Sequence, residues 1–360
     1  MKTLKQAIFA IIAACLLIAA LPAAAADSQQ DAKKLYVFNW VDYMSPNLVK
    51  AFEKEYGVQV VRDFYGTNEE MFAKLRAGGD KLYDVIFPSF YFVPRLIHTG
   101  LVQPLDHSEI PNIKNLFSMF RNPEYDPHNK YSIPYQWGDN GIAYNVTAFP
   151  DKPDSWSLLF DPDVNSKYPF SIMTEAQVMV GAACAYQGHG YDCDTSGDWK
   201  QAAKLLLKTK KRSNFSGFVD GLPGLAQLAR GNTKITVTFN GDYARAKKRD
   251  PEGLAKTEFF VPKEGAELWV DTMAIPMHAP HPALAHKFIN FVLRARMGAM
   301  LSNYNMYSTP NEAAVPYLDD ALSKPPVKPT EEEMKRLHYL PLLKGKDLKT
   351  VNQLWSAIKS

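Results

Sequence analysis

The stretch LYVFNWVDYMSPNLVKAFEKEYG, residues 35–57, decides the fold class. Its first six residues are mostly aromatic or apolar and are typical of a short buried strand. Ser45 can then cap a helix whose first residue is Pro46, and Gly57 can end that helix. The apolar face of this helix would consist of Leu48, Phe52 and Tyr56. A strand that leads into a helix is the building unit of a parallel sheet.

The same alternation continues along the first third of the chain. Residues 58–64 are again strand-like, and Thr67 with Glu70 forms a capping box for the next helix. Residues 84–88 resemble a buried strand that ends at Ser89. The order strand, helix, strand, helix, strand predicts an α/β fold with a parallel sheet, whose functional edge lies at the strand ends.

The remainder of the chain has longer connections that are rich in aromatic residues and proline. We expect helices over 176–186, 199–210 and 283–293, and strands over 235–239 and 269–276. About 330 residues after a leader exceed one comfortable hydrophobic core, so the chain is expected to fold into two lobes.

The first residues predict export. Lys2 and Lys5 precede an apolar stretch that ends in small residues at Ala26, so residues 1–26 are typical of a secretory signal peptide. Cleavage before Cys15, as in bacterial lipoproteins, is an alternative, but the apolar stretch continues beyond that cysteine. No later segment approaches the roughly 20 apolar residues of a membrane span.

The composition disfavours several partner classes. The formal charge is +3, and removal of Lys2 and Lys5 with the leader reduces it to about +1, so neither nucleic acid nor an anionic membrane surface is expected as a partner. Cys184 and Cys193 could close a small disulfide loop or stay unpaired, since pairing needs a geometry that spacing alone does not give.

The candidate site combines aromatic and acidic residues, most of which lie at or just beyond the end of a short apolar run. They are Trp40, Tyr43, Ser89, Tyr91, Glu175, Asp242, Trp269, Asp271 and Tyr307. This combination suits an organic cation. Hydrogen bonds from ammonium to carboxylate are roughly twice as strong as neutral ones. A cation over Trp or Tyr adds on the order of 0.5 to 2 kcal/mol once water is excluded.

Other chemistries have weaker support. The sequence has no Gly-rich phosphate loop, no nucleophile elbow, no His-Glu-x-x-His and no paired-cysteine metal motif. His278, His281 and His286 are better explained by capping and surface positions than by a zinc site. We therefore expect no metal, no cofactor and no catalytic residue. An enzyme in which buried carboxylates act on an amine is kept as an alternative.

Runs of residues along most of the mature chain resemble the motifs of bacterial periplasmic polyamine-binding proteins, the spermidine/putrescine-binding family, in the same order. The runs are YVFNWVDY at 36–43, YDVIFPS at 83–89, YSIPYQWG at 131–138, WVDTMAIP at 269–276 and YSTPN at 307–311. The resemblance implies a two-lobed α/β solute-binding fold with a hinge between its lobes. We expect one lobe over residues 27–143 and 272–320, and the other over 144–271 and 321–360.

The resemblance also implies the contacts of the ligand. Trp40 and Tyr43 would face it together with Asp42, while Ser89 and Tyr91 lie at a neighbouring strand end. The remaining contacts would be Asp242, Trp269, Asp271 and Tyr307. Asp271 is the expected primary anchor, since Trp269, two residues earlier, lies on the same strand face.

Two positions depart from the family pattern. Phe239 stands where many members have Trp, and it is a poorer surface for a cation. Val178 stands where many members have a ligand-contacting Glu, so one partner of the amine is missing. Glu175, three residues earlier, could share the same helix face and is a possible substitute.

The implied partners are a polyamine and a membrane protein. The ligand would be putrescine, spermidine or a related amine such as norspermidine, bound in the periplasm by a monomer that delivers it to the permease of an ABC transporter. A membrane-bound sensor protein that recognises the ligand-bound state is the alternative partner, because both roles need only a ligand-dependent rearrangement.

Overall fold

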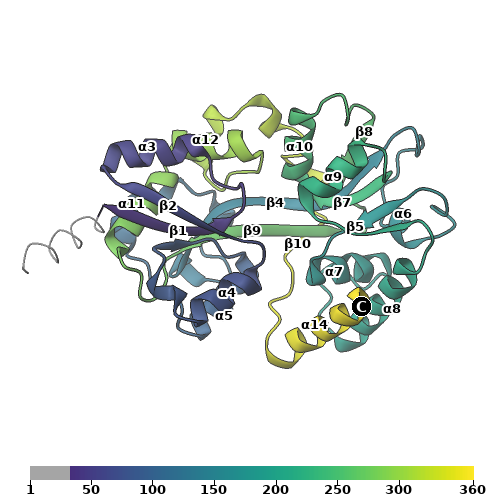
Figure 1. Ribbon diagram of the computed structural model, residues 1–360, viewed down its shortest axis with the longest axis horizontal. Coiled ribbons are helices and arrows are strands. Elements are labelled where there is room, and N and C mark those ends of the chain that lie inside the picture. The colour runs from purple at the N-terminus through teal and green to yellow at the C-terminus, as the bar shows by residue number, and fades with distance from the viewer. Residues whose placement is uncertain (1–32) are drawn as a thin grey trace, which may run out of the picture.

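The computed structural model describes residues 33–360, so the predicted signal peptide at 1–26 and the alternative at Cys15 lie outside the described residues. The chain forms two α/β lobes that lie side by side and are joined by long central strands (Figure 1). Within the described part of the chain, no helix is both long and apolar enough to cross a membrane.

One connected sheet passes through both lobes. In spatial order its strands are β2 (Gln59–Tyr65), β1 (Lys34–Trp40), β3 (Val85–Ile86), β9 (Ala266–Ala274), β4 (Ser132–Asn145), β7 (Ile235–Phe239), β5 (Phe170–Ile172) and β6 (Phe215–Phe218). The short strands β10 (Leu337–His338) and β8 (Thr257–Phe260) pair with β9 and β4 outside this path. β1 is parallel to β2 and β3, as predicted, whereas β9 is antiparallel to β3 and β4.

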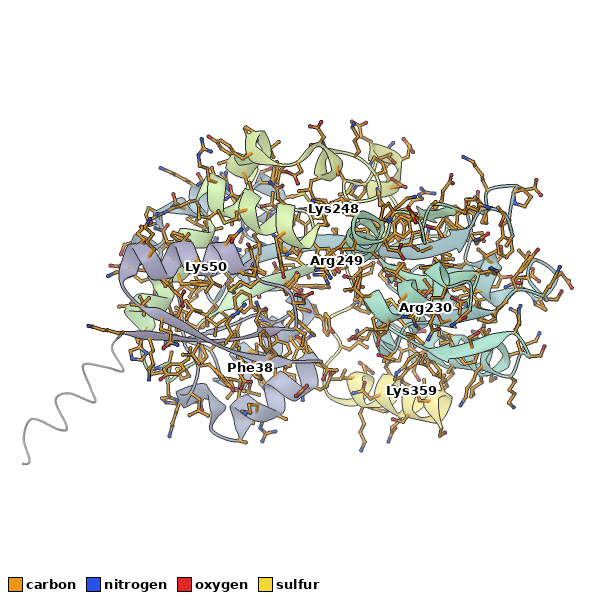
Figure 2. All side chains as sticks on the ribbon, turned by 45° about the horizontal axis from the view of Figure 1, so that its top comes forward. Phe38, Lys50, Arg230, Lys248, Arg249 and Lys359 are labelled. Carbon is orange, nitrogen blue, oxygen red and sulfur yellow. A yellow bond between two sulfur atoms is a disulfide. The ribbon has the colours of Figure 1, made fainter. Side chains whose placement is uncertain are left out.

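Helices surround the sheet in each lobe (Figure 1). The first lobe holds α3 (Pro46–Tyr56), α4 (Asn68–Arg76), α5 (Val93–His98), α11 (Pro282–Val292) and α12 (Ala295–Asn305). The second holds α6 (Ser157–Phe160), α7 (Ala176–Tyr186), α8 (Ser196–Lys210), α9 (Gly221–Ala229), α10 (Asn240–Arg249) and α14 (Gly345–Lys359). A short helix, α13 (Glu331–Met334), precedes β10. Side chains fill both lobes, and Lys248 and Arg249 of α10 lie near the junction between them (Figure 2).

The local signals in the sequence placed several elements correctly. α3 begins after Ser45, whose hydroxyl accepts a hydrogen bond from the Leu48 amide at 3.5 Å, and ends at Gly57 in the left-handed conformation. α7 and β7 have the predicted bounds. α8 begins three residues earlier than expected because Thr195, not a later residue, caps it by accepting from the Asp198 amide at 3.2 Å.

Besides β3, which covers Val85–Ile86 instead of 84–88, two strands differ from the prediction. β9 covers Ala266–Ala274 instead of 269–276, so it begins three residues earlier. β4, which is 14 residues long, was not predicted because it contains proline and glycine. The structure accommodates Pro134 at a shift of register between Pro134 and Gln136. Gly138 is required by close packing, since a Cβ there would lie 2.6 Å from the Trp269 ring.

β4 and β9 connect the two lobes. The first part of β4 pairs with β9, from Ser132 opposite Ala274 to Asp139 opposite Leu268. Its second part pairs with β7 and β8 of the second lobe. In the same lobe, Cys184 and Cys193 are joined by a disulfide, which answers the question that their spacing left open.

Candidate ligand-binding site

Asp271 lies in the middle of β9, one of the two strands that connect the lobes. It is 9% exposed, and its Oδ1 accepts a hydrogen bond of 2.6 Å from the Ser89 hydroxyl. The backbones of these two residues also form an isolated antiparallel bridge. Burial raises the pKa of Asp271 to about 6, although the hydrogen bonds from Ser89 and Tyr43 act in the opposite direction. A cation that pairs with such a carboxyl group stabilises its ionised form.

Asn68, the first residue of α4, fixes Ser89 and Tyr91 in the segment after β3. Its Oδ1 accepts from the Ser89 amide, and its Nδ2 donates to the Ser89 Oγ and the Tyr91 hydroxyl, each at 3.1 Å. Asn68 is buried and was not among the predicted site residues. Asn68 directly follows the cap residue Thr67, and no sequence pattern at this position indicates that it would hold Ser89 and Tyr91.

Four aromatic rings form a continuous group beside Asp271. The Trp269 ring lies 4.9 Å from the Tyr307 ring at an interplanar angle of 86°. Tyr43 packs against Tyr307 at 5.8 Å, and Phe239 packs against Trp269 at 5.8 Å. The tight fit extends to Gly241, where any Cβ would clash with the Tyr307 ring.

Two polar atoms of this aromatic group have no hydrogen-bond partner of good geometry within residues 33–360. They are the Trp269 Nε1 and the Tyr43 hydroxyl. The Tyr43 hydroxyl nevertheless lies close enough to Asp271 to lower the pKa of that carboxyl group. Buried polar atoms are satisfied in most native structures, so unpaired ones mark a place where water or a ligand contributes.

Trp40 lies at the end of β1, beside the same region. Its Nε1 donates to the backbone oxygen of Phe87 at 2.9 Å, and its ring packs on Tyr65 at 4.6 Å. The Tyr65 hydroxyl donates to the same backbone oxygen at 2.5 Å. The indole is therefore held in one orientation and stays partly exposed.

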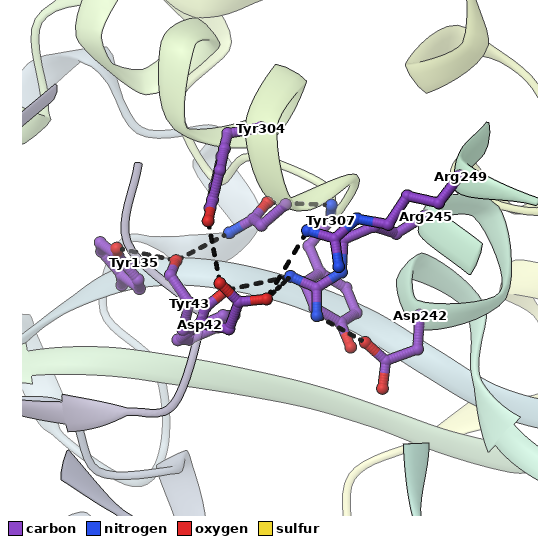
Figure 3. A network of polar contacts seen from close by, with 9 residues as sticks. Asp42, Tyr43, Tyr135, Asp242, Arg245, Arg249, Tyr304 and Tyr307 are labelled. Carbon is purple, nitrogen blue, oxygen red and sulfur yellow. Dashed lines mark hydrogen bonds and ion pairs between the residues drawn. The ribbon is translucent and has the colours of Figure 1, made fainter. Parts of the chain in front are cut away.

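Asp42 and Asp242 belong to an ionic network that connects the lobes (Figure 3). Asp42 accepts a hydrogen bond of 2.9 Å from the Tyr304 hydroxyl, and its Oδ2 lies 3.5 Å from Arg245 and 3.6 Å from Arg249. Arg245 also lies 3.9 Å from Asp242. The Asp42 carboxylate is thus neutralised by side chains of α10, and its predicted role as a ligand contact stays a prediction.

Asp242 lies in the first turn of α10 and faces Tyr307. Burial raises its pKa, while Arg245 and a hydrogen bond from the Tyr307 hydroxyl lower it. The Gly221 backbone approaches its Oδ2 so closely that a Cβ at residue 221 would lie 2.6 Å away. Asp242 therefore holds Tyr307 in position from the second lobe.

Glu175 immediately precedes α7 and is partly exposed. Burial, together with the negative charges of Asp220, Glu69 and Asp271, raises the pKa of Glu175 to about 7. It also raises the pKa of Tyr91, after the larger effect of burial. Val178, where a Glu is common in the resembled family, is buried in the core.

The prediction from sequence missed Glu267, which lies on β9 four residues before Asp271. It is 2% exposed, and its Oε2 has no hydrogen-bond partner among the described residues. The alternation Glu267, Trp269, Asp271 puts all three on one strand face and would have revealed it. The prediction began the strand at Trp269 and so excluded it.

The structure links the predicted residues from positions far apart in the sequence. Contacts between side chains join Ser89, Asp271, Tyr43, Tyr307, Trp269 and Asp242, and Asn68 adds Tyr91. Trp40, Asp42 and Glu175 lie around this group. Within the part of the chain that the structure describes, no three His, Cys, Asp or Glu residues gather so that they could hold a metal ion.

The chain belongs to the bacterial extracellular solute-binding protein family, whose sequence profile matches residues 47–330. It is similar to the putrescine-binding periplasmic protein SpuD of Pseudomonas aeruginosa, with 35% identity over 92% of this chain and 93% of that protein. A putrescine/cadaverine-binding protein of the same species is 35% identical over 96% of this chain and 98% of that protein.

Solved structures agree with these sequence matches. The spermidine/putrescine ABC transporter substrate-binding protein PotD of Streptococcus pneumoniae has a TM-score of 0.78 and 30% identity, and the match covers 91% of this chain and 98% of that one. The resemblance to periplasmic polyamine-binding proteins and the two-lobed α/β fold are therefore confirmed. The relatives are periplasmic solute-binding proteins of transport systems and not enzymes, as predicted for this chain.

Proposed function

We propose that this protein binds a polyamine where its two lobes meet and delivers it to the permease of an ABC transporter. The observation that carries this proposal is the Asp271 carboxyl group, held by Ser89 and surrounded by the rings of Tyr43, Trp269 and Tyr307. A polyamine is a chain of ammonium groups joined by methylenes. Its charges pair with carboxylates, and its methylenes pack against flat apolar rings.

The names of the relatives support the ligand class. SpuD is named for putrescine, the second Pseudomonas protein for putrescine and cadaverine, and PotD for spermidine and putrescine. These ligands are all linear aliphatic amines. We propose Trp40, Tyr43, Ser89, Tyr91, Glu175, Asp242, Trp269, Asp271 and Tyr307 as the ligand contacts, with Asp42 at their edge.

Closure of the lobes would exclude water from this site. We propose that the lobes comprise residues 27–143 with 272–320, and 144–271 with 321–360, and that β4 and β9 form the hinge. The contact of Asp42 with Arg245 supports closure, because it joins the loop after β1 to α10 of the other lobe. Exclusion of water strengthens each charged contact with the ligand.

Delivery to a signalling receptor is the second candidate function. Phe239 and Val178 depart from the pattern of the resembled family, so the site differs from that of a typical transport protein. Cross-linking of the ligand-bound protein in membranes would distinguish the two functions. Capture of a permease supports transport, and capture of a sensor protein in its place supports signalling.

Isothermal titration calorimetry of the purified protein tests the proposal. Putrescine, cadaverine, spermidine and norspermidine are titrated separately, with glutamate as an anionic control. We expect at least one amine to bind with a dissociation constant in the micromolar range or below, and glutamate not to bind. Failure of all four amines would overturn the proposed function.

A further inference from the structure

Glu267 is a buried carboxyl group that the contacts proposed above leave without a role. It lies on β9, is 2% exposed, and its Oε2 has no hydrogen-bond partner in residues 33–360. The Tyr191 hydroxyl lies nearby but donates to the Val178 backbone oxygen at 2.9 Å. A buried carboxyl oxygen without a partner is costly, so its presence calls for a physical explanation.

Several neighbours of Glu267 belong to the candidate site. Burial raises its pKa well above the ordinary value, and the charges of Glu175 and Asp271 raise it further. Tyr91 lies close enough for its own pKa to be raised by Glu267. These neighbours come from the start of α7, from β9 and from the turn after β3. The alternation of side chains along β9 also puts Glu267 on the strand face of Trp269 and Asp271.

We infer that Glu267 binds one ammonium group of a long polyamine whose other end is held by Asp271. The inference rests on the proposed function and deepens it, because it assigns a second anchor on the same strand. An ammonium group would supply the partner that the Glu267 carboxyl group lacks. It would also offset the repulsion among Glu267, Glu175 and Asp271.

The spacing along β9 selects the length of the ligand. Glu267 and Asp271 are four residues apart, so their Cα atoms are separated by roughly 13 Å at about 3.3 Å per residue. At about 1.2 Å per bond, an extended diamine with four methylenes spans roughly 6 Å between its nitrogens, and a triamine with seven spans roughly 11 Å. Side chains that lean toward each other reach both ends of the triamine. The diamine reaches only one anchor.

The same contact predicts a change in protonation. Burial and acidic neighbours favour the neutral form of Glu267 in the free protein. An ammonium group favours the ionised form, so binding of a triamine would release the proton of Glu267 to solvent. A diamine held at Asp271 would leave that proton in place. The number of protons released therefore reports the contact independently of affinity.

Glu267→Gln tests the inference, because it keeps the size of the side chain and removes its charge. We expect the affinity for spermidine to fall by a factor of 10 or more and that for putrescine to change by less than a factor of two. Glu332→Gln makes the same chemical change at an exposed residue of α13 and should alter neither affinity. Glu267→Asp keeps the charge and should fall between the wild type and Glu267→Gln for spermidine.

Calorimetry in buffers of different ionisation enthalpy supplies the second measurement. Spermidine binding should release fewer protons from Glu267→Gln than from the wild type, while proton release on putrescine binding stays unchanged. Unchanged affinity and proton release for spermidine would overturn the inference and leave the proposed function intact. An equal loss of affinity for both amines would also contradict it. Failure of the wild type to bind either amine would refute the proposed function itself.

Discussion

The Ser89 hydroxyl donates a hydrogen bond of 2.6 Å to the Asp271 carboxylate across 182 residues of sequence. This bond connects the segment after β3 to the middle of β9 and fixes the orientation of the Asp271 carboxyl group, whose pKa burial raises. Because Asn68 in turn holds Ser89, the first lobe fixes the Asp271 carboxyl group, the proposed anchor of the ligand, in the ligand-free protein. Positioning of this kind reduces the entropy that binding must overcome.

Asp271→Asn should abolish measurable polyamine binding and make the ligand-free protein more stable. The folded pKa of about 6 lies above the ordinary value of 3.8, so the folded state holds its proton more tightly than the unfolded state. Stability therefore falls as pH rises from 4 to 6 and stays lowered at pH 7. We expect the variant to gain up to about 3 kcal/mol in unfolding free energy at pH 7. Urea denaturation measures the gain, and unaltered binding by the variant would remove Asp271 from the site.

Polyamine affinity should rise with pH between about 5 and 8. The carboxyl groups of Asp271 and Glu175, with pKa values of about 6 and 7, must ionise to pair with ammonium groups. Each group is protonated below its pKa. The bound proton then competes with the ammonium group of the ligand for the carboxylate. The dissociation constant of a diamine, measured over this pH range, should fall by a factor of 10 or more. A flat profile would show that neither carboxylate contacts the amine.

Phe239→Trp should strengthen binding of every amine that the protein accepts. The Phe239 ring packs at 76° against Trp269 and is partly exposed, so a larger ring has space toward solvent. An indole attracts a cation more strongly than a benzene ring does, and we expect a gain of about 0.5 to 1 kcal/mol. Phe239→Leu serves as the control that removes the ring. Equal affinities for the Trp and Leu variants would exclude a cation contact at this position.

Asp42→Asn should weaken closure of the lobes without changing the preference among ligands. The Asp42 carboxylate contacts Arg245 and Arg249 of the other lobe and is exposed, so its loss should cost less than about 1 kcal/mol. Small-angle X-ray scattering should show a larger radius of gyration for the ligand-saturated variant than for the wild type. A selective loss of triamine binding would instead make Asp42 a direct contact of the ligand, as the family resemblance implies.

Local signals allowed much of the fold to be predicted from the sequence. Ser45 and Gly57 bound α3 because caps depend on neighbouring residues alone. β4 was missed because its stability comes from β9 and β7, more than 90 residues away in sequence, which override the presence of Pro134 and Gly138. Pairing over such distances leaves no local pattern.

The candidate site could be predicted only in part, because some of its residues have local sequence signals and others do not. Asp271 and Trp269 lie in a motif, whereas Asn68 contributes only through the way α4 packs beside Ser89. Glu267 was missed because the bounds of β9 depend on pairing with β4 and β10. Asp42 contacts Arg245 in the structure. Whether it can also contact a ligand depends on the relative orientation of the lobes, which no local sequence pattern encodes.

A crystal structure of the protein grown with spermidine tests the central claim most directly. We predict one ammonium nitrogen within about 3 Å of an Asp271 carboxylate oxygen, with the methylenes against Trp269 and Tyr307. Spermidine bound elsewhere, with Asp271 still paired to Ser89 alone, would contradict the account.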